Sequence, residues 1–508
     1  MLSTGLTASR GEQDDTPRSS SPTPQILASG MDDVAVTAVD KKQLSSDNSA
    51  GNSESGEKEA EFKEGGYGWV VVTSVTLINA HTWGLNSSYA VFLAYYLRSD
   101  LIAGASPLSF AFVGGLSVSI ALLVSPIVTV CIGYFGTTTT LRIGTVLEAI
   151  SFIGASFSTQ IWHLILSQGV CFGLGMGFCF TATVGLIPQW FVKRRSFANA
   201  IAAGGSGLGG LTYSLATNAM ISNLGLAWAF RILAIISFVV NGACTLTVRD
   251  RNKAVGAIHV AFHLPLFRRI EYWFYIGWGF FGIISYIIVV FSITDYAQVV
   301  GFTATQGSIA AAVFNLSQGI GRPVIGLASD RFGRLNVAGL GTLVACVTAF
   351  LLWILAGKHY PGLIIYALFG VFAGVLWPCV APVGAEVVGL QLLPSALSMY
   401  WLALVLPSTF AEVIGLCLRD HGVDGYIKVQ TLTGALYVAS FLSIWLLRSW
   451  KIQNMDALDL DEQQREAGIQ DADVISTIAS TTGRQSGARP ISEIVRAYIS
   501  AMFVVRRV

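Results

Sequence analysis

Apolar runs of about 20 residues recur along most of this chain, separated by short polar turns. A helix of that length spans the hydrocarbon core of a bilayer, so each run predicts one membrane-spanning helix. From hydropathy the runs lie at 68–92, 108–132, 139–158, 162–187, 197–221, 227–248, 271–293, 305–327, 336–356, 361–385, 395–418 and 429–448. The pattern therefore predicts an all-α membrane protein with twelve transmembrane helices.

The second half of the chain echoes the first. Five residues recur at a constant offset of roughly 200 residues, as a two-half repeat requires: Pro126, Phe135, Gly136, Gly144 and Thr145 match Pro323, Phe332, Gly333, Gly341 and Thr342. The charges differ between the copies, since Gly133, Tyr134 and Thr137 stand where the second copy has Asp330, Arg331 and Arg334. The repeat predicts two bundles of six helices with the second and eighth helices equivalent.

The composition of the chain also indicates a membrane protein. Of 508 residues, 53% are hydrophobic and 12% are charged, whereas soluble domains carry about 25% charged residues. The formal net charge of +1 gives no indication of nucleic-acid binding. The seven cysteines lie in apolar runs without zinc or disulfide spacing, so we interpret them as small hydrophobic residues. No nucleophile–base constellation or metal-ligand spacing is visible, so we expect neither an enzyme nor a cofactor.

The domain organisation follows from these runs. Residues 1–64 are polar with few aromatics and predict a disordered cytoplasmic tail. Residues 65–248 form the first six-helix bundle, 249–270 the cytoplasmic loop between bundles, and 271–448 the second bundle. Residues 449–508 form a cytoplasmic tail, whose end has apolar residues at helical spacing flanked by arginines; this is either a basic amphipathic helix or a marginal helix without a role.

Charge asymmetry predicts the orientation, because loops rich in Lys and Arg stay in the cytoplasm. With both termini inside, the inner loops hold Arg142, Lys193, Arg194, Arg195, Arg249, Arg251, Lys253, Arg268, Arg269, Arg331 and Arg334, whereas the outer loops hold Arg98, Lys358, Arg419 and Lys428. We therefore expect a multi-pass membrane protein with both termini in the cytoplasm.

Residues 315–336 concentrate the candidate chemistry. Asn315, Gln318 and Arg322 share one face of the eighth helix. An arginine within a membrane helix costs about 2.5–3.5 kcal/mol on insertion scales, so Arg322 must face a partner or a water-filled cavity. It binds substrate or ties the helix to a neighbour, and the amides of Asn315 and Gln318 line the cavity or bond a facing helix.

The end of this stretch, Asp330-Arg331-Phe332-Gly333-Arg334, predicts a short loop at the membrane surface. We expect Asp330, Arg331 and Arg334 to form an inner gate network that stabilises one transport state without touching substrate. The glycine-rich run 204–210 lies in an apolar helix and predicts a packing surface rather than a phosphate loop.

Three stretches resemble the monocarboxylate transporter family of the major facilitator superfamily. Glu64-Gly65-Gly66-Tyr67-Gly68-Trp69 resembles its first-helix signature, and Gly321-Arg322-Pro323, running on to Ser329–Arg334, resembles its eighth helix and the superfamily loop motif. Pro188–Phe191 with Lys193-Arg194-Arg195, and Leu393–Leu397, are similar to the fungal branch. The resemblance covers roughly 65–448.

This resemblance implies two six-helix bundles around a central cavity, moving by alternating access. It also implies that Arg322 anchors a substrate carboxylate. The family has a carboxylate four residues earlier and a first-helix lysine that take part in proton coupling, but this chain has Gln318 and Ser87 there. The departure favours substrates other than lactate or pyruvate.

Other polar residues in the helices are candidates for coupling or binding. His81 either carries a coupling proton or donates to a carbonyl, and Glu148 and Glu412 are intramembrane carboxyl groups able to take up a proton. Asn86 is a candidate substrate contact on the first helix. Phe281, Tyr286, Trp377 and Trp401 wall the cavity, face lipid or belong to the core.

Three functional hypotheses remain open. The first is a secondary active transporter of a small organic anion or monocarboxylate-like metabolite, by symport with protons or down its own gradient, in the fungal plasma membrane. The second is an efflux transporter of a fungal secondary metabolite. The third, from another class, is a transporter-like nutrient sensor that signals through its tails. The expected partners are a small-molecule substrate, protons and the lipid bilayer.

Overall fold

The computed structural model describes residues 64–99, 107–356, 358–420, 422, 424–466, 500, 504 and 506. These residues belong to the second of two compact units of the chain, Ala60–Val508. The expected N-terminal tail, except for Glu64, and most of the expected C-terminal helix lie outside the described residues. Within the described part, every element of regular structure is helical.

Twelve elements occupy the first predicted bundle. They are α2 (Gly68–His81), α3 (Trp83–Ser87), α4 (Tyr89–Ser99), α5 (Pro107–Leu123), α6 (Ser125–Phe135), α7 (Thr137–Ala155), α8 (Ile161–Leu164), η2 (Ile165–Cys171), α9 (Phe172–Val184), η3 (Ile187–Gln189), α10 (Arg195–Leu224) and α11 (Leu226–Thr247). The first and fourth predicted spans are each built from several consecutive helices, and α10 forms the fifth in one piece.

The connecting segment holds two short helices, α12 (Asn252–Val255) and η4 (Leu264–Arg268). The second bundle follows with α13 (Ile270–Val299), α14 (Ala304–Phe332), α15 (Arg334–Thr348), η5 (Ala349–Ala356), α16 (Tyr360–Leu368), α17 (Gly370–Ala373), α18 (Leu376–Ala403), α19 (Val405–Leu418) and α20 (Ile427–Glu466). Helical segments thus occupy all twelve predicted spans.

The hydropathy of these helices separates two groups. Six helices of the described part are long and apolar enough to cross a membrane, or seven if α5 and α6, bent by 45°, count as one span. The long helices α10 and α14 are not among them. Both carry glycines and polar residues through their middle, which is typical of surfaces that face other helices or a cavity rather than lipid.

Two expectations about boundaries need correction. Asp330, Arg331 and Phe332 are not a loop, because α14 continues through Phe332 and the chain turns only at Gly333, with φ +105°. The twelfth helix does not end near residue 448, because α20 runs on to Glu466. Hydropathy marks where apolar residues stop, whereas backbone hydrogen bonding continues into the polar residues beyond.

The repeat is visible in the backbone conformation as well as in the sequence. Gly136 and Gly333 both end a helix with positive φ and donate their N–H to the fourth carbonyl before them. Gly225 and Gly422 also have positive φ, and they are separated by the same 197 residues as the first pair. A backbone with positive φ favours glycine, because glycine has no Cβ that would clash there.

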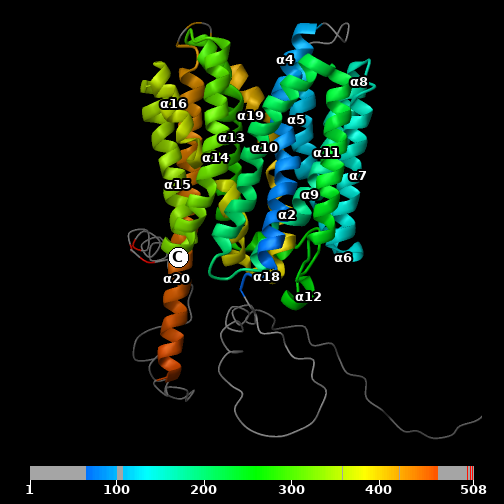
Figure 1. Cartoon of the computed structure of the whole chain (residues 1–508). Coiled ribbons are helices and arrows are strands. Elements are labelled where there is room, and N and C mark those ends of the chain that lie inside the picture. Colours follow the sequence, from blue (N-terminus) through cyan, green and yellow to red (C-terminus); the bar gives the residue numbers. More distant parts are fainter. Residues whose placement is uncertain are drawn as a thin grey trace, which may run out of the picture. The chain divides into compact units, whose positions relative to one another are not determined.

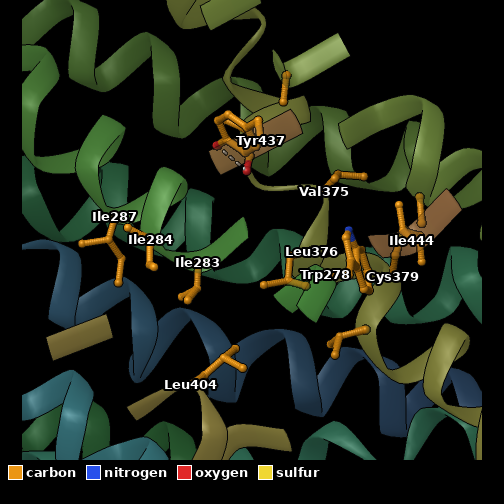
Figure 2. Close-up of a cluster of buried hydrophobic side chains, with 14 of the residues drawn as sticks. Trp278, Ile283, Ile284, Ile287, Val375, Leu376, Cys379, Leu404, Tyr437 and Ile444 are labelled. Atoms are coloured by element: carbon orange, nitrogen blue, oxygen red, sulfur yellow. Dashed lines mark hydrogen bonds between the residues drawn. The ribbon is translucent and has the colours of Figure 1, made fainter. Parts of the chain in front are cut away.

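The second bundle has its own apolar core. Figure 2 shows Trp278 of α13 and Cys379 of α18 close together, with Ile444 of α20 beside them. Trp278 is fully buried and its indole N–H donates to Thr342 Oγ1 at 3.1 Å. Tyr437 reaches across to the carbonyl of Ala373. This packing fixes the helices that carry the candidate site.

The two bundles meet along two seams. In the first seam α10 lies against α14, and Figure 1 shows these helices side by side. In the second seam α5 and α6 lie against α18 and α19. Ser119 Oγ lies 2.6 Å from Thr409 Oγ1, and Ser125 Oγ donates to the carbonyl of Ser398 at 3.0 Å. The second seam therefore combines helix packing with hydroxyl contacts.

Glycines bring the backbones of the first seam together. A Cβ on Gly204 would lie 2.8 Å from the Gly319 carbonyl oxygen, and one on Gly207 would lie 2.7 Å from the Gly319 nitrogen. The other side of α10 does the same within the first bundle, where a Cβ on Gly205 would lie 2.2 Å from the Thr76 carbonyl oxygen. The expected packing role of run 204–210 matches these contacts.

We predict that Gly205→Ala destabilises the first bundle, because its methyl group cannot fit against the backbone of α2. Overpacking of this kind costs about 1–3 kcal/mol. The measurement is the thermal unfolding midpoint of the purified protein. Gly242→Ala on α11 is the matched control, since a Cβ there meets nothing within 4 Å. Equal midpoints for the two variants would contradict the prediction.

Candidate functional site

Five aromatic side chains from both bundles meet between the seams. Trp83 of α3 lies 5.2 Å from Phe180 of α9 and 5.0 Å from Trp377 of α18, measured between ring centroids. Trp401 lies 5.0 Å from Phe180 and is stacked on Trp377 at 6.0 Å. Tyr286 of α13 packs on Trp377 at 6.0 Å. The aromatics expected to wall a cavity or fill the core are thus joined, except Phe281, into one cluster between the bundles.

The helices that supply this cluster are interrupted. The first span breaks at Thr82 and Ser88, on either side of Trp83, and the fourth contains the π-helix η2 before Phe180. The tenth span breaks at Phe369 and again at Gly374, just before Trp377. Interrupted helices near the bilayer midplane often form substrate sites in transporters, because their ends expose backbone groups to the cavity.

Arg322 lies beside this cluster and is 3% exposed. Its Nη1 donates to the Ala203 carbonyl and to Ser206 Oγ of α10, each at 2.7 Å, so its side chain crosses the first seam. Its Nη2 donates to Gln318 Oε1 one turn earlier on α14. Its Nε has no hydrogen-bond partner among the described residues. Every described acceptor of this guanidinium is neutral.

Gln318 connects the arginine to the aromatic cluster. Its Oε1 also accepts a hydrogen bond from the Tyr286 hydroxyl at 3.1 Å. Gly374 packs over both side chains, and a Cβ there would lie 2.7 Å from Gln318 Oε1 and 3.3 Å from Arg322 Nη2. The break in the tenth span therefore lies directly against the buried charge.

The two asparagines expected to contact substrate are placed differently. Asn315 lies on α14 two turns before Arg322 and is half-buried, with no described hydrogen bond from its side chain. Asn86 accepts a hydrogen bond from Ser117 Oγ at 2.8 Å, which joins α3 to α5 inside the first bundle. The structure therefore joins Gln318 with Arg322 and does not join Asn86 to them.

The titratable candidates lie apart from Arg322. His81 Nδ1 bonds the Leu77 carbonyl at 2.8 Å and its ring packs on Tyr213, as a satisfied structural histidine would. Glu148 is 0% exposed within the first bundle, where Asn241 Nδ2 of α11 donates to its Oε2 at 2.8 Å. Its Oε1 has no described partner. Glu412 is partly buried on α19, at the second seam.

A charged cluster closes the end of the bundles that carries the basic loops, which we call the basic end. Asp330 accepts the backbone N–H groups of Ser196 and Phe197 at 2.9 and 2.8 Å, so it caps the N-terminus of α10 from the other bundle. Arg334 pairs with Glu386 and donates to the Val192 carbonyl at 2.7 Å. These contacts join the two bundles.

Arg331 does not belong to this cluster. It is exposed, and its described contact is with the ring of its neighbour Phe332 at 5.6 Å. Lys451 of α20 belongs to the cluster instead, with Nζ 3.5 Å from Glu386 Oε2. Asn199 of α10 also bonds across the bundles, to the Pro378 carbonyl at 2.8 Å. Sequence reasoning missed both residues because neither lies in the loop motif.

Ser206 is the most informative residue that the sequence did not single out. It lies inside the glycine-rich run of α10, which was interpreted only as a packing surface. A hydroxyl within a stripe of small residues is a usable signal, because it places a polar group where two backbones come closest. The identity of its partner, Arg322, requires knowledge of which helices pair.

Comparison with known proteins agrees with this architecture. The family model of the Major Facilitator Superfamily matches residues 72–411 and 273–449. A solved structure of the proton:xylose symporter XylE has a TM-score of 0.61 at 15% sequence identity, over 75% of this chain and 95% of that one. The predicted fold class, an all-α major facilitator fold, is confirmed, and helices of the described part occupy all twelve predicted spans.

Fungal proteins are similar in sequence. "Probable transporter MCH2" of Saccharomyces cerevisiae is 30% identical over 399 residues, 77% of this chain and 84% of that protein. "Fujikurins efflux protein" of Gibberella fujikuroi is 24% identical over 375 residues, 72% of this chain and 79% of that protein. These relatives and the family model support a transporter rather than an enzyme. The chain belongs to the Major Facilitator Superfamily and is a multi-pass membrane transporter.

Proposed function

We propose that the chain is a secondary active transporter of a small organic anion and that Arg322 binds the anionic group. The supporting observation is the environment of Arg322, which is buried between the bundles with neutral acceptors only. A buried cation without a counter-ion is unfavourable, so an anion that reaches the site gains a strong interaction. The resemblance to monocarboxylate transporters belongs to this proposal and points to a carboxylate.

The aromatic cluster gives the proposed site its second component. Trp83 and Trp377 are partly exposed where the bundles meet, whereas Trp401 is fully buried and stacks on Trp377; the indole N–H groups of Trp83 and Trp401 have no described hydrogen-bond partner. Such a surface suits an apolar body that carries a few hydrogen-bond acceptors. Gln318 and Asn315 add amide groups on the Arg322 side, and Asn86 joins them if its bond to Ser117 opens.

The proposed alternating-access mechanism assigns a gating role to the charged residues at the basic end. We propose that Asp330 and Arg334 form the gate at the basic end and that Arg331 contributes only charge to that surface. Both bundles contribute to this cluster, so the gate must break when the basic end opens. The proposed orientation has both termini in the cytoplasm of a fungal cell, in the plasma membrane.

We predict that Arg322→Ala lowers uptake of the transported anion about tenfold to a hundredfold, since a hydrogen bond to a charged group contributes about 1.5–3 kcal/mol. The measurement is uptake of a panel of labelled monocarboxylates into proteoliposomes, with and without an inward proton gradient. Arg231→Ala is the matched control, because Arg231 packs on Phe157 and Trp228 away from the site. Unchanged uptake by Arg322→Ala would remove Arg322 from the binding site.

The second candidate function is export of a larger metabolite, and the similarity to the fujikurins efflux protein favours it. Folded wild-type protein that takes up no monocarboxylate in either orientation would reject the first proposal and support this one. A transport measurement with the tails deleted separates both from the sensor hypothesis, because a transporter keeps its activity without them.

We propose Glu148 as the proton-binding group. It is fully buried, its described donor is the neutral amide of Asn241, and no cation is among its described partners. Glu148→Gln keeps the shape of the side chain and removes the titrating group. It should reduce uptake under an inward proton gradient to the level measured without one.

The corresponding test of the alternative carboxyl group is Glu412→Gln, on the second seam. We expect this variant to keep its stimulation by the proton gradient. If Glu412→Gln loses the stimulation and Glu148→Gln keeps it, the proton-binding group is Glu412 and our assignment is wrong. Thermal unfolding of each variant shows whether the protein remains folded.

A further inference from the structure

The bonds of Arg322 form a closed group across the first seam. Nη1 donates to the Ala203 carbonyl and to Ser206 Oγ, and the Ser206 hydroxyl donates to the same carbonyl at 2.9 Å. Arg322 belongs to the second bundle, whereas both acceptors belong to the first. We propose that Arg322, Ser206 and the Ala203 carbonyl form a latch that holds the bundles together, with Ser206 as its positioning residue.

The glycines of the seam make the latch specific to the observed arrangement. The guanidinium reaches a carbonyl of α10 because Gly204 and Gly207 admit the backbone of α14 at Gly319. When the bundles separate at the basic end, this close approach is lost and the two bonds from Arg322 to α10 must break together, whereas the bond from Ser206 to Ala203 stays within α10. The latch therefore stabilises the state in which the basic end is closed.

The latch has a counterpart in the second seam. With the separation of 197 residues between the repeats, the position equivalent to Arg322 is Ser125. Ser125 is fully buried and also donates across the bundles, to the Ser398 carbonyl at 3.0 Å. The same place in both repeats thus bonds the opposite bundle, and only the first seam uses a charge to do so.

The charge gives the latch a way to respond to substrate. An anion that binds Arg322 competes with the neutral oxygens of Ala203 and Ser206, and a charged acceptor bonds a guanidinium more strongly than a neutral one. Anion binding would then release the first bundle. This step rests on the proposed transport of an anion, whereas the latch itself does not.

The test measures the separation of the bundles without any substrate. Spin labels are attached at Tyr134→Cys and Phe332→Cys, two exposed positions that precede the equivalent glycines Gly136 and Gly333 at the basic end. The background has the native cysteines replaced. Pulsed electron paramagnetic resonance in lipid nanodiscs then gives the populations with short and long distances between the labels.

We expect Ser206→Ala to raise the ratio of long-distance to short-distance populations about tenfold, because the closed state loses a bond to a charged group. Ser206→Thr keeps the hydroxyl and should restore the wild-type ratio. Ser222→Ala is the matched control on the same helix, since its hydroxyl is exposed and bonds within α10. It should leave the ratio unchanged.

Two results would overturn the latch. One is a Ser206→Ala ratio within twofold of wild type in protein that still unfolds cooperatively. The other is an equal shift in Ser222→Ala, which would indicate a general effect on α10. Because no substrate is added, failure of the protein to transport any monocarboxylate would reject the proposed function and leave the expected distance change in place.

Discussion

The close approach of α10 and α14 is the constraint on which the site depends. Two helices of ordinary composition are held apart by their side chains, and a guanidinium on one could not reach the backbone of the other. Gly204, Gly207 and Gly319 have no side chains, so the two backbones approach closely at these positions. The result is a cation placed in the middle of the protein and bonded by oxygens that carry no net charge.

The polar contacts between the bundles differ in strength between the basic end and the centre of the protein. At the basic end, a carboxylate caps a helix of the other bundle and an ion pair supports it. At the centre, Arg322 bonds neutral groups, and Ser119 and Thr409 share a weaker hydroxyl contact. A hydrogen bond to a charged group contributes about 1.5–3 kcal/mol, against about 0.5–1.5 kcal/mol for a neutral one, so the bonds of Arg322 and Asp330 are individually the stronger contacts.

Much of this arrangement could be predicted from the sequence. Periodicity placed Gln318 and Arg322 on one face, and the repeat anticipated the paired turns at Gly136 and Gly333. The partners of Arg322 on α10 could not be predicted, because Ser206 and Ala203 lie more than a hundred residues away and only helix pairing brings them close. The helical end of α14 was missed because a charged run resembles a loop, although Asp330 needs the helix to aim its carboxylate at α10.

The difference between Ser125 and Arg322 has an electrical consequence. The two halves of the fold are related by a repeat, but at these equivalent positions one seam carries a full positive charge and the other a hydroxyl. At this pair of equivalent positions, the fixed positive charge therefore lies on the α14 side only. Under the proposed transport of an organic anion, the negative group of the solute would face α14, where Arg322 supplies the positive charge.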